Sequence, residues 1–170
     1  SRISGSELHI HHTLMLTGPP GTGKTSLARA LLKENGYAVK ELNASDIRTK
    51  TLVSGLVTET SSFRSLTRKP VGIIMDEVDG MSCGDRGGMS ELVEYAKATG
   101  LRACPLICIC NNGSDKKFEY LRKESQIVEF SKPTNDEMKT VVEKVVESEK
   151  IKGIDASMID IIISSAQKDF

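Results

Sequence analysis

The chain of 170 residues contains no tryptophan, only three tyrosines and four phenylalanines, and no long apolar run. With so few aromatic rings, we do not expect a surface that stacks nucleobases. Its 23 basic residues are balanced by 23 acidic ones, so any contact with nucleic acid must come from a local patch. We see no signal-peptide pattern and no stretch of membrane-spanning length, so we expect an intracellular, soluble protein without membrane contact.

Cysteine is also scarce. The four cysteines are Cys83, Cys104, Cys108 and Cys110. Three of them fall on one apolar stretch, and their spacing lacks the paired C-x-x-C knuckles of a structural zinc site. We therefore expect reduced thiols in the core. The histidines at positions 9, 11 and 12 lack a fourth ligand, so we expect them to lie on the surface rather than to bind a metal.

Residues 18–25 read Gly-Pro-Pro-Gly-Thr-Gly-Lys-Thr and fit the phosphate-binding pattern G-x-x-x-x-G-K-[ST] in full. Gly21 and Gly23 let the backbone curl, so that successive N–H groups form an anion nest at a helix N-terminus. Lys24 is placed to reach the outer phosphates, and the Thr25 hydroxyl can ligand Mg²⁺. The candidate phosphate-binding residues are Gly18, Pro19, Pro20, Gly21, Thr22, Gly23, Lys24 and Thr25.

The flanks of this loop supply the context that the pattern requires. Residues 12–17 read as a short buried strand, and residues 24–35 carry an apolar stripe with helical spacing that Gly36 ends as a C-cap. Because strand, glycine loop and helix follow in order, a chance match in a glycine-rich turn is the weaker alternative.

Residues 71–77 form an apolar run that ends in Asp76 and Glu77. Such a run is typical of a parallel strand buried on both faces, whose carboxyl end carries the chemistry. Asp76 is a candidate to hold Mg²⁺ through a water, as the Walker-B acid does in P-loop enzymes, and Glu77 is placed to orient and deprotonate the attacking water. The alternative is a solvated acidic turn after an ordinary strand, but the phosphate loop upstream favours the catalytic interpretation.

A third apolar run, residues 104–110, ends in Asn111 and Asn112. An amide at this strand end can sit between the γ-phosphate and the attacking water, so Asn111 is a candidate sensor. The alternative is an asparagine that stabilises a turn through its own backbone, and this is the role that we expect for Asn112.

Strand-like and helix-like segments alternate along the chain. We expect strands at 12–17, 37–42, 71–76, 104–110 and 127–130, and helices at 24–35, 45–59, 88–99 and 114–121. This alternation predicts an α/β fold with a parallel sheet flanked by helices on both faces. The phosphate loop assigns this fold to the P-loop NTPase type. Residues 131–133 break the pattern. Thr134 or Asn135 can then cap a helix, and a further helix is expected at 155–167. The predicted domains are 1–131 and 132–170; the alternative is a helical extension packed on the sheet.

Together, residues 18–25, Asp76, Glu77 and Asn111 resemble the AAA+ ATPases. Residues 41–46, Glu-Leu-Asn-Ala-Ser-Asp, resemble a box typical of clamp-loader subunits. Residues 75–81, followed by Asp-Arg-Gly-Gly at 85–88, resemble the large subunits of clamp loaders of the replication factor C type. The resemblance covers most of the chain, and the last two segments are its specific parts.

This resemblance implies a nucleotide-binding AAA+ domain followed by a partial helical lid, with ATP and Mg²⁺ as cofactors. It implies that Lys24 binds phosphate, Thr25 and Asp76 hold the metal, Glu77 activates water and Asn111 senses the γ-phosphate. The implied partners are small clamp-loader subunits, a sliding clamp and primer-template DNA in replication and repair. The implied location is the nucleus for a eukaryotic chain and the cytoplasm otherwise.

Basic residues near the start of the 45–59 helix touch template phosphates in the clamp-loader family. In this chain they are Arg48 and Lys50. A helix N-terminus adds its own attraction for phosphate. The alternative for each is an ordinary solvated helix face.

The chain also departs from the family. Small clamp-loader subunits carry an arginine finger before the last strand, where this chain, registered on Phe130, has Lys123-Glu124-Ser125. Glu124 cannot stabilise transition-state phosphate charge, and Arg122 lies out of register, so the resemblance implies a subunit that receives a finger and donates none. The lead-in before the loop is shorter than in the family, and the chain stops near where a second sensor arginine would follow.

Two alternatives to a working clamp-loader subunit remain open. The first is an AAA+ subunit of a related alternative clamp loader or of a damage-checkpoint complex. The second is a scaffold subunit that binds nucleotide with little turnover.

Overall fold

The computed structural model describes residues 12–43, 69–81, 86–97 and 104–166. The chain divides into two compact units. The first comprises Ser1–Gly18 and Gly23–Phe130, and the second comprises Pro19–Thr22 and Ser131–Phe170. The predicted helix at 45–59 lies outside the described residues.

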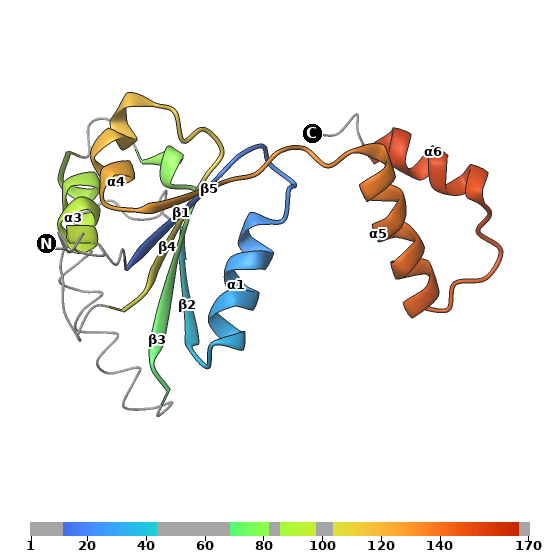
Figure 1. Cartoon of the computed structure of the whole chain (residues 1–170), viewed down its shortest axis with the longest axis horizontal. Helices are drawn as coiled ribbons and strands as arrows, with labels where there is room; N and C mark the ends of the chain where they lie inside the picture. The colour runs from blue at the N-terminus through green and yellow to red at the C-terminus, as the bar shows by residue number, and fades with distance from the viewer. Residues whose placement is uncertain (1–11, 44–68, 82–85, 98–103, 167–170) are drawn as a thin grey trace, which may run out of the picture. The chain divides into compact units, whose positions relative to one another are not determined.

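A parallel β-sheet forms the centre of the first unit (Figure 1). Its strands are β1 (Thr13–Thr17), β2 (Ala38–Asn43), β3 (Val71–Asp76), β4 (Leu106–Cys110) and β5 (Gln126–Glu129), in the order β2-β3-β4-β1-β5. Each neighbouring pair runs parallel, which confirms the predicted fold class. The central strands β3 and β4 are buried almost throughout, because helices cover both faces of the sheet.

The two faces of the sheet carry separate cores. Alternate side chains of a strand point to opposite faces, so Ile74 packs with Ala28 and Leu32 of α1 (Lys24–Glu34), whereas Ile73 and Met75 face the other side. On that side lie η2 (Val78–Gly80), α3 (Arg86–Lys97), η3 (Lys116–Phe118) and α4 (Glu119–Lys123). Figure 1 shows α1 on one face of the sheet and α3 and α4 on the other.

Helix α1 ends one residue before the position that the sequence indicates. Asn35 is the C-cap, and Gly36 follows it with a φ of 80°. The Gly36 N–H donates to the carbonyl of Lys33 at 3.0 Å, and the Tyr37 N–H donates to that of Leu32 at 2.9 Å. These two bonds form a Schellman motif, which requires a left-handed residue just after the cap and so favours glycine there.

Other boundaries differ from the predictions by a few residues. The helix expected at 88–99 spans Arg86–Lys97, and the strand expected at 127–130 spans Gln126–Glu129. The helix expected at 114–121 is a short 3-10 turn that continues into α4 and ends at Lys123. The Asp115 carboxylate accepts a bond from the Lys117 N–H at 3.1 Å and so starts this turn later than expected.

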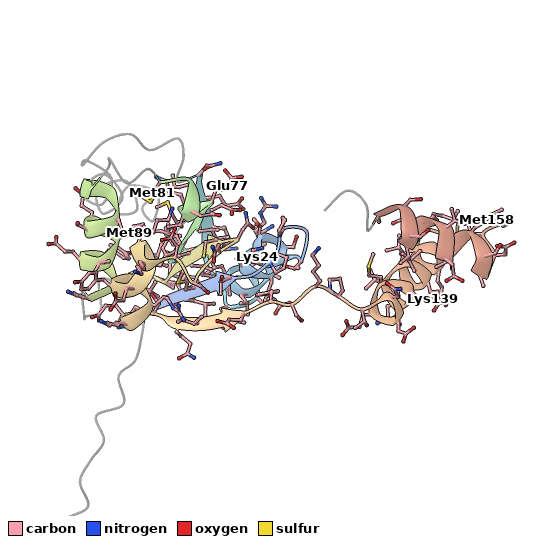
Figure 2. All side chains as sticks on the ribbon, turned by 90° about the horizontal axis from the view of Figure 1, so that it is seen from above. Lys24, Glu77, Met81, Met89, Lys139 and Met158 are labelled. Atoms are coloured by element: carbon pink, nitrogen blue, oxygen red, sulfur yellow. The ribbon has the colours of Figure 1, made fainter. Side chains whose placement is uncertain are left out.

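The second unit holds two helices, α5 (Asn135–Ser148) and α6 (Ala156–Ala166). Of the two candidate caps, Thr134 is the residue used: its hydroxyl accepts from the Glu137 N–H, and the Glu137 side chain accepts from the Thr134 N–H. Lys139 of α5, which Figure 2 labels, pairs with Asp160 of α6 at 3.3 Å. No helix in the described ranges is both long enough and apolar enough to span a bilayer.

Gly72 of β3 lies against α1, and this contact yields a prediction for the core. A Cβ at Gly72 would lie 2.5 Å from a Leu32 methyl group. We expect Gly72→Ala to lower the free energy of unfolding by about 1–3 kcal/mol through overpacking. Adding Leu32→Ala should relieve the clash, so that urea denaturation shows the double variant to be more stable than the summed single effects by about 0.5–3 kcal/mol. Additive single effects would contradict this contact.

Candidate active site

The phosphate loop between β1 and α1 has the backbone that its glycines permit. Gly18, Gly21 and Gly23 have positive φ values of 142°, 74° and 81°, and Gly23 is the N-cap of α1. At Gly18 a Cβ would lie 2.3 Å from the carbonyl oxygen of Phe130, so no other residue fits without a shift of the backbone. The Thr22 hydroxyl donates to the carbonyl of Pro19 at 2.9 Å and closes the turn at the tip of the loop.

Lys24 is the first residue of α1, and its side chain is buried. Only 6% of the residue is exposed. Its Nζ donates to the carbonyl of Gly18 at 2.7 Å and to the Asn111 side-chain oxygen at 3.3 Å. Burial lowers the pKa of Lys24, whereas Cys110, Asp76 and Asp79 act to raise it. A phosphate anion beside this ammonium would stabilise its charged form further.

Thr25 and Asp76 meet across the start of α1 and the end of β3. The Thr25 hydroxyl donates to Asp76 Oδ2 at 2.8 Å, and Asp76 Oδ1 accepts from the Glu77 N–H at 2.8 Å. A hydroxyl and a carboxylate side by side suit Mg²⁺, which takes a few protein oxygens and completes its octahedron with water and phosphate oxygens. Among the described residues no group of three or more His, Cys, Asp or Glu side chains could hold a metal by itself.

Glu77 follows β3 at the same edge of the sheet as the loop, and Figure 2 labels it together with Lys24. Its φ of 54° and ψ of 41° are left-handed, a conformation that costs a non-glycine residue about 1–3 kcal/mol and is often found at functional sites. The Glu77 carboxylate is exposed and accepts from the Asn43 side-chain amide at 2.8 Å. It is therefore oriented by a neighbouring strand while it stays accessible to solvent.

Asn43 is a site residue to which the sequence assigned no role of its own. It ends β2, pairs with Asp76 in the β2–β3 register and reaches Glu77 from there. An amide at the carboxyl end of a strand beside the acidic one is the signal that could have identified it, once the strand order was known.

The Asn111–Gly113 turn after β4 completes the site. The Asn111 side chain meets Lys24, as described, while its N–H donates to Asp79 Oδ2 at 3.3 Å. The Asn112 side-chain oxygen accepts from the Ser114 N–H at 3.2 Å, which is a turn-forming bond. The Gly113 N–H donates to the Thr17 hydroxyl at 2.8 Å and fixes the turn to β1.

The structure thus brings Lys24, Thr25, Asp76, Glu77 and Asn111 to one edge of the sheet. Arg48, Lys50, Cys83 and most of the 41–46 box lie outside the described residues. Glu124 follows α4, and Arg122 donates to the carbonyl of Gly113 at 3.4 Å.

The described cysteines, Cys104, Cys108 and Cys110, are free thiols. Burial raises the pKa of Cys108 to about 12, and it also raises the pKa of Cys110. Both thiols therefore stay protonated at neutral pH and pack as small apolar groups.

Comparison with known proteins identifies a family and several relatives of this chain. Residues 14–132 match the ATPase family associated with various cellular activities (AAA). The replication factor C large subunit of Nanoarchaeum equitans is 42% identical over 153 residues, which are 89% of this chain and 35% of that protein. Replication factor C subunit 1 of Saccharomyces cerevisiae is 35% identical over 94% of this chain and 20% of its own length.

A solved structure agrees on the fold. A chain of the Escherichia coli HORMA:CdnC:Trip13 complex superposes with a TM-score of 0.63 at 16% identity, over 92% of this chain and 60% of that chain. The chain spans about a third of the length of the archaeal relative and about a fifth of the yeast one. The family match and the relatives confirm the resemblance that the sequence motifs carry. The chain therefore belongs to the AAA family of ATPases, as a homologue of the replication factor C large subunit over the part that it covers.

Proposed function

We propose that this chain is the ATP-binding and ATP-hydrolysing subunit of a DNA sliding-clamp loader, of the replication factor C large-subunit type. The observation that carries the proposal is the hydrogen bond of 2.8 Å between Thr25 and Asp76, which joins the phosphate loop to the acidic strand end. The relatives named replication factor C large subunit and replication factor C subunit 1 support the choice of clamp loader among AAA functions.

In this proposal the backbone N–H groups of residues 18–25 and the Lys24 ammonium bind the β- and γ-phosphates. Thr25 and Asp76 would hold Mg²⁺, which would neutralise charge on the phosphate oxygens. Their side-chain oxygens already lie side by side, so the chain needs little rearrangement to bind the metal. Lys24 and Asn111, which contact one another, mark where the γ-phosphate would lie.

Glu77 is the proposed general base. Its exposed carboxylate can accept the proton of a water that attacks the γ-phosphate, and the Asn43 amide fixes the direction of that carboxylate. Asn111 would orient the same water or the γ-phosphate from the neighbouring strand end. The chemistry is therefore positioning plus charge stabilisation, as phosphoryl transfer requires.

The rest of the proposal concerns the assembly. Glu124 occupies the place of the arginine finger, so this chain would donate no finger to a neighbour. A small clamp-loader subunit would supply the finger for the site of this chain in trans. Residues 1–131 would form the AAA+ domain and residues 132–170 part of its helical lid. The proposed partners are the small subunits, a sliding clamp and primer-template DNA, in the nucleus of a eukaryote or in the cytoplasm otherwise.

Glu77→Gln tests the catalytic assignment. The amide keeps the shape of the side chain but cannot accept a proton, so we expect steady-state ATP turnover to fall by about 10²–10⁴-fold. Binding of a fluorescent ATP analogue should stay near the wild-type value. Glu94→Gln on the exposed face of α3 is the matched control and should turn over ATP normally. Normal turnover in Glu77→Gln would refute the role of Glu77.

The clamp-loading function is tested in the assembled complex. We expect ATP hydrolysis by the chain mixed with candidate small subunits to rise when sliding clamp and primed DNA are added, because the partners complete the site. Lys24→Ala should remove the chain's share of this stimulation by weakening its hold on the phosphates. If nucleotide binds normally but clamp and DNA never stimulate hydrolysis, the result favours the alternative of a scaffold subunit that binds nucleotide with little turnover.

The proposed DNA contact of Arg48 predicts a specific salt dependence. Arg48→Ala should weaken binding of the assembled complex to primed DNA by a similar factor for unrelated sequences, because a phosphate contact carries no base information. The slope of log K against log[salt] should decrease by about 1. Lys33→Ala, an exposed cation near the end of α1, is the control. An unchanged slope in Arg48→Ala would exclude the contact.

A further inference from the structure

Asp79 is a carboxylate at the edge of the candidate site to which nothing above assigns a role. It lies in η2, the short turn directly after Glu77, and it is half-buried. Its Oδ2 accepts from the Asn111 N–H at 3.3 Å. Its backbone carbonyl accepts from Lys117 Nζ at 2.6 Å. Asp79 therefore contacts two segments that follow β4.

The contact between Asp79 and Asn111 lies beyond the point where β3 and β4 stop pairing. The pairing of β3 with β4 runs from Ile73 and Leu106 to Met75 and Cys108, whereas β4 continues to Cys110. Beyond that register the turn after β3 and the end of β4 are joined by the Asp79 carboxylate. On the opposite side of β4, Thr17 of β1 holds the same turn through the Gly113 N–H. The Asn111–Gly113 turn is thus held from both sides of β4, by Asp79 after β3 and by Thr17 of β1.

Lys117 connects Asp79 to the core. Its Nζ lies 5.1 Å from the centroid of the Phe118 ring, and Phe118 is fully buried among the side chains of the sheet. A lysine held over a buried ring and bonded to a backbone carbonyl has little freedom to move. The carbonyl of Asp79, and with it the η2 turn, is consequently fixed by η3.

The consequence concerns the γ-phosphate side of the site. The Asn111 side chain meets Lys24 Nζ at 3.3 Å, so the Asn111 backbone sets where amide and ammonium come together. We propose that Asp79, braced by Lys117, is a positioning residue for hydrolysis: its carboxylate fixes the Asn111 backbone, and so aligns the Asn111 amide with Lys24. The inference rests on the proposed ATPase function.

A charge effect of Asp79 on Lys24 is the competing explanation, and substitution separates the two. Asp79→Asn keeps an oxygen that can accept from the Asn111 N–H, but it removes the negative charge. Asp79→Ala removes both. If Asp79 acts by positioning, the asparagine variant should keep most of the hydrolysis rate, whereas the alanine variant should lose it.

The test uses steady-state hydrolysis and binding of ATP by the chain in its complex with the small subunits. We expect Asp79→Ala to lower kcat by about tenfold to a hundredfold, since small misplacements at a reacting centre have effects of this size. The affinity for ATP should change little, because the phosphate loop is untouched. Asp79→Asn should recover most of the rate. The amide-proton exchange of Asn111, followed by NMR in the nucleotide-free chain, should quicken in the alanine variant alone.

Lys117 offers a second, independent variant, with its neighbour as the control. Lys117→Met should lower kcat in the same direction as Asp79→Ala, whereas Lys116→Met, an exposed lysine on the same turn, should not. Equal rates in both lysine variants would overturn the bracing role.

The outcomes separate this inference from the proposed function. A wild-type complex that turns over ATP, with Asp79→Ala equally fast or Asp79→Asn as slow as the alanine variant, overturns the positioning role and leaves the ATPase standing. A wild-type complex that binds no ATP or never hydrolyses it overturns both.

Discussion

The hydrogen bond between Thr25 and Asp76 is the contact on which the candidate site depends. It joins the first turn of α1 to the carboxyl end of β3 at 2.8 Å, across segments that are far apart in the chain. Parallel pairing makes it possible, because β1, β3 and β4 all end at one edge of the sheet, where the loop after β1 turns into α1. A shift of β3 by one residue would turn Asp76 to the other face and break this contact.

The edge of the sheet holds a strained backbone conformation at Glu77 and a buried charge at Lys24. Glu77 is held in a left-handed conformation, and the Lys24 ammonium is buried with a lowered pKa. Neither state would persist in a loosely packed region, because relaxation would release it. Here the almost fully buried strands β3 and β4 lie directly beneath, with Ile74, Met75 and Cys108 almost inaccessible to solvent. Strain at the edge is thus offset by packing in the layer below.

Features marked by a contiguous stretch of sequence could be predicted, whereas contacts between strands distant in sequence could not. The loop, the buried strands and the residues Lys24, Thr25, Asp76, Glu77 and Asn111 belong to contiguous patterns, in which a local signal marks each strand end. The roles of Asn43 and Asp79 could not be predicted, because their contacts exist only after strands distant in sequence become neighbours. Asn43 contacts Glu77, and Asp79 contacts the Asn111 N–H. Helix ends were also displaced, since bonds such as the one from the Lys117 N–H to Asp115 decide them.

The electrostatics of the described residues bear on why such a subunit would work in an assembly. Phosphoryl transfer develops charge that more than one cation usually stabilises. Arg29 is already paired with Glu41 through two bonds of 2.6 Å, and Arg122 faces the carbonyl of Gly113. Lys24 binds the phosphates in the proposed mechanism, and Glu124 has the wrong sign for a finger. In the proposed mechanism neither Arg29 nor Arg122 acts as the finger, and a neighbouring subunit would supply this cation. A neighbouring subunit that supplied it would gate hydrolysis through assembly itself, which is the coupling that a clamp loader needs.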